Sequence, residues 1–189
     1  MMKDRVIKAY EWSKLKHAGQ KRKYVDLEYF SHPKWVARTL EDTGDEVLIV
    51  AGLIHDVLED CCSSKEEYDI TLQEIIAMFG QDVANIAVEL CNDREKIKAL
   101  SKVVYMSQKI LALSYKATIV KLVDRIHNLL FAETDNAPYD FIKKYYKESI
   151  QLLKIWELRP DKDELMNKYI LMLSTVLEFY RIRYNGFAK

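Results

Sequence analysis

Apolar residues recur along most of the chain at the three- and four-residue spacing of amphipathic helices. The first stripe predicts a helix over about residues 5–17, which Gly19 ends. Residues 19–31 lack this spacing, so we expect an irregular segment or a short hairpin there. Later stripes predict helices over about residues 31–41, 46–58, 71–79, 81–90, 95–113, 116–132, 139–156 and 163–184.

Helix-start signals sharpen two of these boundaries. Pro33 suits the first turn of the helix that begins near Ser31. Thr71 and Glu74 have the spacing of a capping box, which predicts that a short helix begins at Thr71. No linker, repeat or low-complexity tract interrupts the series. The pattern therefore predicts an all-α protein of about eight to ten helices, in a single domain over residues 1–189.

Composition agrees with a helical globular protein, since the chain is 49% apolar and 31% charged and has five Gly and three Pro. No apolar run is long enough for a membrane span, and the N-terminal residues lack a signal-peptide core. Cys61, Cys62 and Cys91 resemble neither a disulfide framework nor a zinc-thiolate site, which favours a reducing, cytoplasmic location. The formal net charge of +0 argues against broad nucleic-acid binding but permits a small anionic ligand.

Four acidic or imidazole side chains cluster at the end of the apolar run EVLIVAGLIHDVLED. If that segment is helical, His55, Asp56, Glu59 and Asp60 share neighbouring parts of one helix surface. Buried carboxylates are costly without a partner, and a cation is a natural one. We therefore expect half of a metal-dependent hydrolytic site here. An exposed helix end with solvated acids is disfavoured, because acids at a helix C-terminus oppose the helix dipole.

Two more clusters carry candidate chemistry. Asp124 and Asn128 lie four residues apart in a core-facing stretch, which suits a metal ligand beside a substrate-orienting amide. Arg22 and Lys23 precede His32 in the irregular segment, where they could hold a phosphate or stack on a base. A solvated loop is the competing interpretation of this basic pair.

The ordered combination of these motifs resembles a known family. The order of three motifs, HP at His32, HDxxED at His55 and VKLxDRxHN around Asp124, resembles the pattern of the HD-domain metal phosphohydrolases. The stretches HAGQKRKYVDLEYFSHPKWVA, AGLIHDVLEDC, FGQDVANIAVEL and KATIVKLVDRIHNL are similar to the hydrolase domain of the RelA/SpoT family. Chain length resembles the stand-alone small alarmone hydrolases, a group that includes the metazoan SpoT-like enzymes.

The resemblance implies an HD-type helical bundle that holds one divalent metal, most often Mn²⁺, on His32, His55, Asp56 and Asp124. Ligand type alone also leaves Fe, Zn or Mg open. Glu59 and Asp60 would position and deprotonate the attacking water, and which of them is the base stays open.

The implied reaction is hydrolysis of the 3′-diphosphate of guanosine tetra- or pentaphosphate to GDP or GTP and pyrophosphate. Arg22, Lys23, Asn128 and Tyr145 would contact the nucleotide. Nucleic acid and membranes are not expected partners, and a homodimer is an open alternative to a monomer.

Other interpretations remain. Residues 25–30 depart from the Gly and Pro-Tyr-Ile that usually precede the HP motif in this family, which leaves the substrate open. NADPH, through its 2′-phosphate, and nucleoside 5′-phosphates are alternatives, as is a nucleotide sensor without turnover. His17 and His127 are more simply structural histidines.

Overall fold

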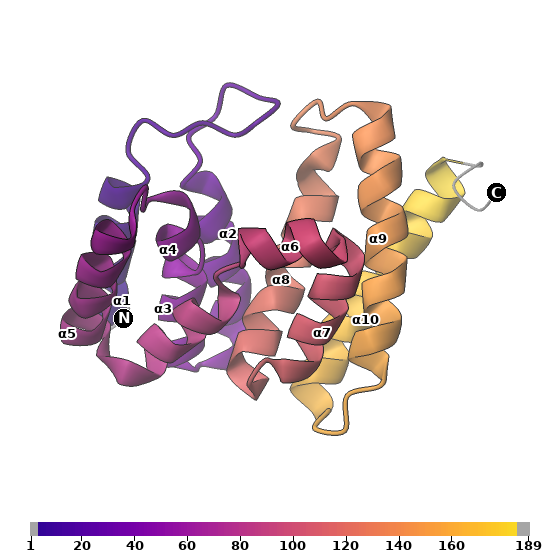
Figure 1. Cartoon of the computed structure of the whole chain (residues 1–189). Helices are drawn as coiled ribbons and strands as arrows, with labels where there is room; N and C mark the ends of the chain where they lie inside the picture. The colour runs from indigo at the N-terminus through magenta and orange to yellow at the C-terminus, as the bar shows by residue number, and fades with distance from the viewer. Residues whose placement is uncertain (1–3, 185–189) are drawn as a thin grey trace. The chain divides into compact units, whose positions relative to one another are not determined.

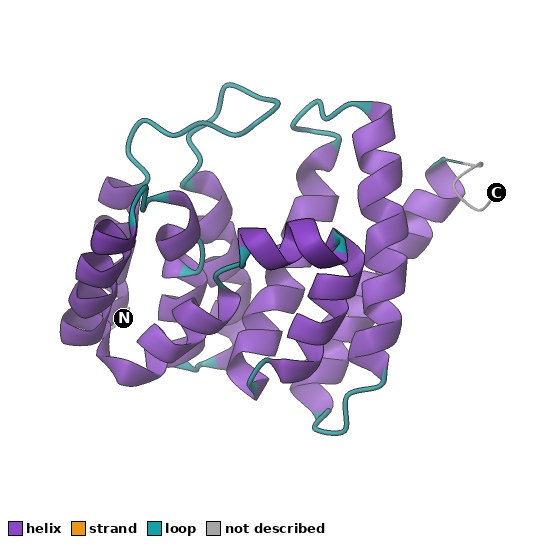
Figure 2. Ribbon diagram, viewed as in Figure 1, coloured by secondary structure: helices purple, strands orange, loops and turns teal. Residues whose placement is uncertain are grey.

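The computed structural model describes residues 4–184 (Figure 1). This range contains ten α-helices and one 3-10 helix, and Figure 2 shows no strand in it. The prediction of an all-α protein with eight to ten helices is therefore confirmed. The chain divides into two compact units, one of residues up to Arg22 and Asp26–Asn92, the other of Lys23–Val25 and the residues from Asp93 onward. The prediction of a single domain stays a prediction, and its residues 1–3 and 185–189 lie outside the described range.

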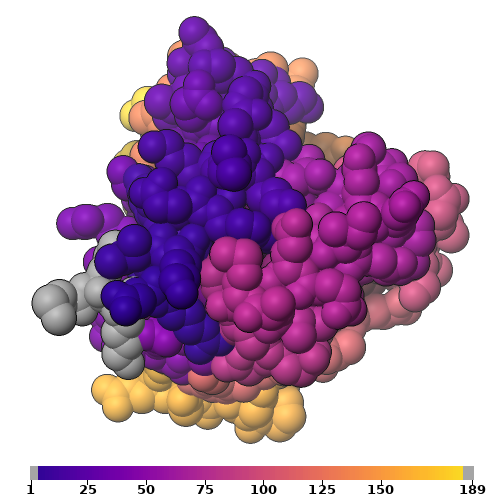
Figure 3. Space-filling view, turned by 90° about the vertical axis from the view of Figure 1, so that its left-hand side faces the viewer, coloured from indigo at the N-terminus to yellow at the C-terminus, as the bar shows by residue number. Residues whose placement is uncertain are grey.

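The first unit contains five α-helices and a 3-10 turn: α1 (Asp4–Lys16), α2 (Ser31–Leu40), η1 (Glu41–Thr43), α3 (Glu46–Ile54), α4 (Val57–Asp60) and α5 (Lys65–Leu90). Helix α3 is the centre, because it packs against α1, α2 and α5. The Ser13 hydroxyl on α1 donates to the Leu53 carbonyl on α3 at 2.5 Å. Figure 3 shows the face where α1, in indigo, lies beside the purple and magenta α5.

Between α1 and α2 the chain forms a loop closed by an isolated antiparallel bridge between Lys21 and Glu28. The expectation of an irregular or hairpin-like segment is confirmed. The backbone N–H of Arg22 donates to the Leu27 carbonyl at 2.8 Å, and that of Tyr29 donates to the Gln20 carbonyl at 2.9 Å. These bonds return the chain to the start of α2, which holds His32 and Pro33 in its first turn.

The helix that carries the HD motif is shorter than predicted. Helix α3 begins at an Asp45 cap, whose side chain accepts from the N–H groups of Val47 and Leu48, and ends at Ile54 instead of Leu58. At this helix end His55 Nδ1 donates to the Gly52 carbonyl at 2.8 Å. The chain then starts a separate single turn, α4, after Asp56.

Helix α5 begins earlier than predicted. Ser64 caps it by accepting from the Glu67 N–H, and Glu67 in turn accepts from the Ser63 N–H at 2.7 Å. Thr71 therefore lies inside the helix, and the predicted start at Thr71 is wrong, because the competing Ser64 cap lies further upstream. The predicted break near Gly80 is real, since this residue has φ +80° within an otherwise helical run.

The second unit contains the remaining five helices: α6 (Arg94–Leu100), α7 (Lys102–Ala112), α8 (Tyr115–Ala132), α9 (Tyr139–Glu157) and α10 (Glu164–Arg183). Helices α8, α9 and α10 pack against one another, and α7 packs against α9. The predicted helix over residues 95–113 is two helices, because Ser101 has φ +69° and interrupts the helical backbone. None of the helices in residues 4–184 is both long and apolar enough to cross a membrane.

Candidate active site

Two histidines and an aspartate meet in the first unit. His32 comes from the first turn of α2 and is 1% exposed, and His55 follows α3 and is 2% exposed. Asp56 is the residue before α4, so the break between α3 and α4 directs its carboxylate toward both rings. One ligand atom of each residue lies within 4.8 Å of the other two. The structure thus brings together three of the four predicted metal ligands.

The charges in this cluster are suited to a cation. Oδ2 of Asp56 lies 3.0 Å from Nε2 of His55 and 3.4 Å from Nε2 of His32. Burial opposes ionisation of Asp56, but His55 and then His32 outweigh it and hold the pKa of this carboxyl well below its ordinary value. Because His55 Nδ1 donates to the Gly52 carbonyl, Nε2 is the ring nitrogen that faces the Asp56 oxygen, and it offers a lone pair whenever the ring is unprotonated. Two electron-pair donors this close repel each other unless a proton or a metal ion lies between them, so the donor set fits a divalent metal.

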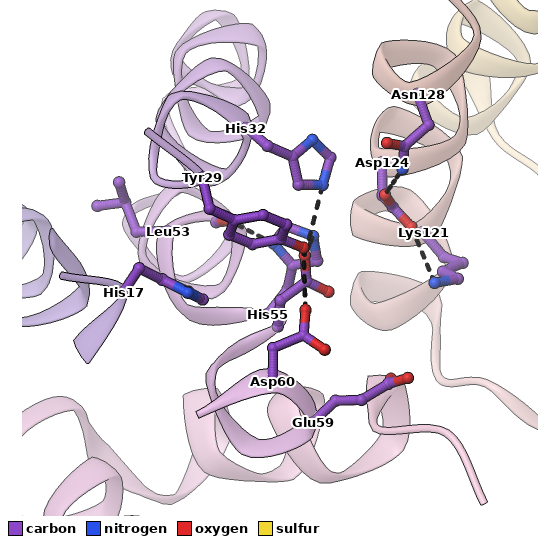
Figure 4. A network of polar contacts seen from close by, with 12 residues as sticks. His17, Tyr29, His32, Leu53, His55, Glu59, Asp60, Lys121, Asp124 and Asn128 are labelled. Carbon is purple, nitrogen blue, oxygen red and sulfur yellow. Dashed lines mark hydrogen bonds and ion pairs between the residues drawn. The ribbon is translucent and has the colours of Figure 1, made fainter. Parts of the chain in front are cut away.

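Tyr29 connects this cluster to the next acid. Its hydroxyl lies 2.7 Å from Oδ2 of Asp56 and 3.0 Å from Oδ2 of Asp60 (Figure 4). No motif in the sequence pointed to Tyr29, which lies in the stretch that departs from the family pattern. Its contact with Asp60 spans 31 residues, and sequence spacing does not encode such a contact.

Asp60 differs electrostatically from Asp56. Desolvation within the cluster, followed by the negative charges of Asp56 and Glu59, raises the pKa of Asp60 to about 6, while the Tyr29 hydrogen bond partly opposes the increase. Gln20 fixes the backbone beneath it, since its Nε2 donates to the Asp60 carbonyl at 3.0 Å. Asp60 is thus a carboxyl that can hold or release a proton near neutral pH.

Glu59 is held by a different partner. Its Oε2 accepts from the Asn92 backbone N–H at 3.0 Å and from Asn92 Nδ2 at 2.8 Å. Asn92 is 33 residues away, beyond the end of α5, and nothing in the sequence signals this contact. Figure 4 shows the Glu59 and Asp60 side chains leaving α4 in different directions.

The fourth predicted ligand, Asp124, lies on α8 in the second unit. Its Oδ2 accepts from Lys121 Nζ at 2.8 Å, and its Oδ1 accepts from Asn128 Nδ2 at 2.5 Å (Figure 4). The predicted pairing of Asp124 and Asn128 on one helix face is thus present. The role of Asp124 as a metal ligand stays a prediction.

The residues that are predicted to contact the substrate belong to both units. In the second, Lys23 Nζ lies 5.0 Å from the Tyr24 ring centre and 5.7 Å from that of Phe141. Phe141 stacks on Tyr145 at 5.7 Å, and the Arg125 guanidinium lies 4.3 Å from the Tyr145 ring. A row of aromatic rings edged by cations is chemically suited to a nucleobase. Arg22 is half-buried in the loop of the first unit, and its assignment to the substrate, like those of Lys23, Asn128 and Tyr145, stays a prediction.

The two histidines expected to be structural are both buried. His17 Nδ1 donates to Gln20 Oε1 at 2.8 Å, and burial lowers the pKa of His17. His127 stacks on Phe131 with 4.4 Å between ring centres. These contacts agree with the structural interpretation.

The chain matches a family model described as HD domain over residues 9–153. It belongs to the HD domain family. This match extends over both compact units and includes every candidate ligand.

The chain is similar in sequence to two proteins that are named as pyrophosphohydrolases. The chain is 31% identical over 166 residues to a probable guanosine-3′,5′-bis(diphosphate) 3′-pyrophosphohydrolase of Synechocystis, covering 82% of the chain and 21% of that protein. It is 35% identical over 128 residues to the guanosine-3′,5′-bis(diphosphate) 3′-pyrophosphohydrolase of Xenopus tropicalis, covering 66% of the chain and 67% of that protein. The chain therefore spans about a fifth of the Synechocystis relative and two thirds of the frog relative.

A solved structure has a similar fold. It belongs to a metazoan ortholog of SpoT described as hydrolysing ppGpp, with a TM-score of 0.74 and 22% identity. The alignment covers 99% of this chain and 98% of that one. The all-α HD-type fold expected from the sequence is therefore confirmed.

Proposed function

We propose that the chain is a metal-dependent pyrophosphohydrolase that acts on guanosine tetra- or pentaphosphate. Water would attack the phosphorus bonded to the 3′-oxygen, and the bond from that phosphorus to the 3′-oxygen would break. The products would be GDP or GTP and pyrophosphate. The observation that carries the proposal is the cluster of buried His32 and His55 with half-buried Asp56, to which Tyr29 links a second acid, Asp60. The names of the Synechocystis and Xenopus relatives support this choice of substrate.

His32, His55 and Asp56, with Asp124 from α8, would hold the metal, which we propose is Mn²⁺. A bound divalent metal supplies Lewis-acid polarisation of phosphoryl oxygens and lowers the pKa of a bound water. The Gly52 carbonyl fixes the orientation of the His55 ring, as outer partners do for ligating histidines.

Glu59 and Asp60 would handle protons. Hydrolysis removes one proton from the attacking water and returns one to the departing 3′-oxygen, so two carboxyl groups with different environments suit the task. Asp60, with a pKa of about 6, can change its protonation state near neutral pH. Glu59 receives two amide hydrogen bonds on one oxygen and is oriented by them.

Lys23 and Tyr145, with Arg22 and Asn128, would hold the nucleotide. The Phe141 and Tyr145 rings are nearly parallel, Tyr24 meets Phe141 edge-on, and Lys23 lies over the Tyr24 and Phe141 rings. We further propose that the protein acts in the cytoplasm, which the three free cysteines support.

The test is incubation of the purified protein with ppGpp and Mn²⁺, with metal content measured on the same sample. Stoichiometric release of GDP and pyrophosphate is expected, and Glu59→Gln should remove it. Glu66→Gln makes the same chemical change at an exposed site on α5 and should retain full activity. Metal-loaded protein that releases no pyrophosphate would overturn the proposal, and NADPH and nucleoside 5′-monophosphates in the same assay would identify another substrate.

A further inference from the structure

Asn92 makes an unusual contact with one of the proposed catalytic acids. Both its backbone N–H and its side-chain amide donate to the same oxygen, Oε2 of Glu59, at 3.0 and 2.8 Å. Two donors from one residue fix the position of that oxygen more firmly than a single bond, because rotation about either bond breaks the other. The direction of the second oxygen, Oε1, is then determined as well.

Asn92 lies between two helix ends. It follows Cys91, the C-terminal cap of α5, and precedes Asp93, the N-cap of α6. The partial negative charge at a helix C-terminus and the partial positive charge at a helix N-terminus oppose each other, so the helix dipoles do not orient the Glu59 carboxylate. Its orientation follows from the two amide donors of Asn92.

Helix α4 alone cannot orient Glu59. It is a single turn of four residues, Val57–Asp60, and a glutamate side chain has three rotatable bonds. The opposite end of that side chain therefore needs a partner from another element, and the contact between α4 and α5 supplies it. Catalytic groups need this second layer of support to keep a productive geometry.

We propose that Asn92 is the positioning residue for Glu59: its two amide groups hold Oε2 and so direct Oε1 for work on the attacking water. The inference rests on the proposed hydrolytic function and deepens it. Asn92 touches neither the substrate nor the metal ligands in this role and acts only through Glu59.

Substitutions at Asn92 should change turnover and leave the other properties of the site intact. Asn92→Ala keeps the backbone donor and removes the side-chain donor, so kcat should fall about 10-fold to 100-fold, as for the loss of one hydrogen bond to a charged group. KM and bound Mn²⁺ should stay within about twofold of wild type, since neither depends on Glu59 in this scheme. Asn92→Asp places a second carboxylate beside Glu59 and should lower kcat further, whereas Asn92→Ser keeps a donor and should recover part of the activity.

A double-mutant cycle separates positioning from general damage. In a Glu59→Gln background, Asn92→Ala should cause almost no additional loss, because the residue it acts through is already disabled. Asn85→Ala makes the same change at an exposed position of α5 and should leave kcat unchanged. Additive losses in the cycle, or a loss of bound Mn²⁺ in Asn92→Ala and Asn92→Ser, would overturn the proposal.

Each variant is assayed with ppGpp and with bis-p-nitrophenyl phosphate, a chromogenic diester that reports on hydrolysis without recognition of a nucleotide. Turnover of the diester without turnover of ppGpp would reject the proposed substrate and still test Asn92 through the cycle. Metal-loaded wild-type protein that hydrolyses neither would overturn both proposals.

Discussion

The Tyr29 hydroxyl lies 2.7 Å from Oδ2 of Asp56, a carboxylate that faces two buried histidines. The same hydroxyl lies 3.0 Å from Oδ2 of Asp60. A tyrosine has one proton to donate, so the hydroxyl donates to one of these two carboxylate oxygens at a time. Donation to Asp60 favours the ionised form of that carboxyl and so opposes the rise of its pKa to about 6.

Tyr29→Phe should therefore raise the pKa of Asp60 above about 6, because the hydrogen bond from Tyr29 is the largest of the interactions that lower this pKa. The measurement is a carboxyl ¹³C NMR titration of metal-free protein. Tyr68→Phe removes a hydroxyl elsewhere in the first unit and should leave the Asp60 titration unchanged. An Asp60 pKa that falls or does not change in Tyr29→Phe would contradict this account.

The raised pKa of Asp60 also predicts a pH dependence of stability. Folding favours the protonated carboxyl, since its pKa is about 6 in the folded protein and 3.8 ordinarily. The stabilisation from this group is complete below pH 3.8 and is lost as the pH rises through 6. The measurement is the free energy of unfolding with a metal chelator present, for wild type and for Asp60→Asn. The difference, wild type minus variant, should fall between pH 3.8 and about 6 and then level off. Asp56 acts in the opposite direction, and the subtraction removes the part of its contribution that does not depend on Asp60. A difference that rises with pH would refute the assignment.

Gly52 allows α2 and α3 to approach closely beneath the two histidines. A Cβ atom there would lie 2.9 Å from Leu40 Cδ1 and 3.1 Å from the backbone Cα of Ala37. Gly52→Ala should reduce the free energy of unfolding by about 1–3 kcal/mol through overpacking, measured by urea denaturation. It should also weaken Mn²⁺ binding, because a displaced α2 moves His32 away from His55. Unchanged metal affinity in a destabilised variant would show that the helix spacing does not set the ligand geometry.

The sequence was most informative where a long apolar stripe defines a helix. The predictions for α8 and α9 agree with the structure within one residue at each end, because packing of these stripes determines both helices. It was least informative where a single side chain changes the backbone. Helix α3 ends at Ile54, where His55 bonds back to the Gly52 carbonyl, and Ser101 adopts a positive φ; neither feature follows from periodicity.

The candidate site shows the same contrast. His32, His55 and Asp56 could be predicted because their residue types and order form a motif, and the structure brings them together. Tyr29 and Asn92 could not be assigned from the sequence. Their importance comes from tertiary contacts to Asp60 and Glu59 that span 31 and 33 residues, which sequence spacing does not encode.

Substitutions of two neighbouring acids, Asp56 and Glu59, should affect metal binding and turnover differently. Asp56→Ala should lose bound Mn²⁺, since it removes the carboxylate that both histidines face. Glu59→Gln should keep the metal and lose turnover, since its partner is Asn92. Metal content by mass spectrometry after loading and desalting distinguishes them, and Asp140→Ala, at an exposed carboxylate on α9, should match wild type. Equal metal loss in both variants would contradict this division of roles.

Lys121 and Asp124 form a buried ion pair on α8. Lys121 Nζ lies 2.8 Å from Asp124 Oδ2, with side chains 11% and 9% exposed. Removing one partner of a buried pair leaves an uncompensated charge, so Lys121→Met should reduce the free energy of unfolding by about 3 kcal/mol in metal-free protein. Lys121→Met combined with Asp124→Asn should recover most of that loss, because no buried charge from the pair remains. If Asp124 is a metal ligand, Mn²⁺ should stabilise Lys121→Met more than the combined variant, because a bound cation then replaces the missing ammonium group beside Asp124. Urea denaturation of the three proteins with and without Mn²⁺ measures these differences, and equal stabilisation of both variants by the metal would exclude Asp124 as a ligand.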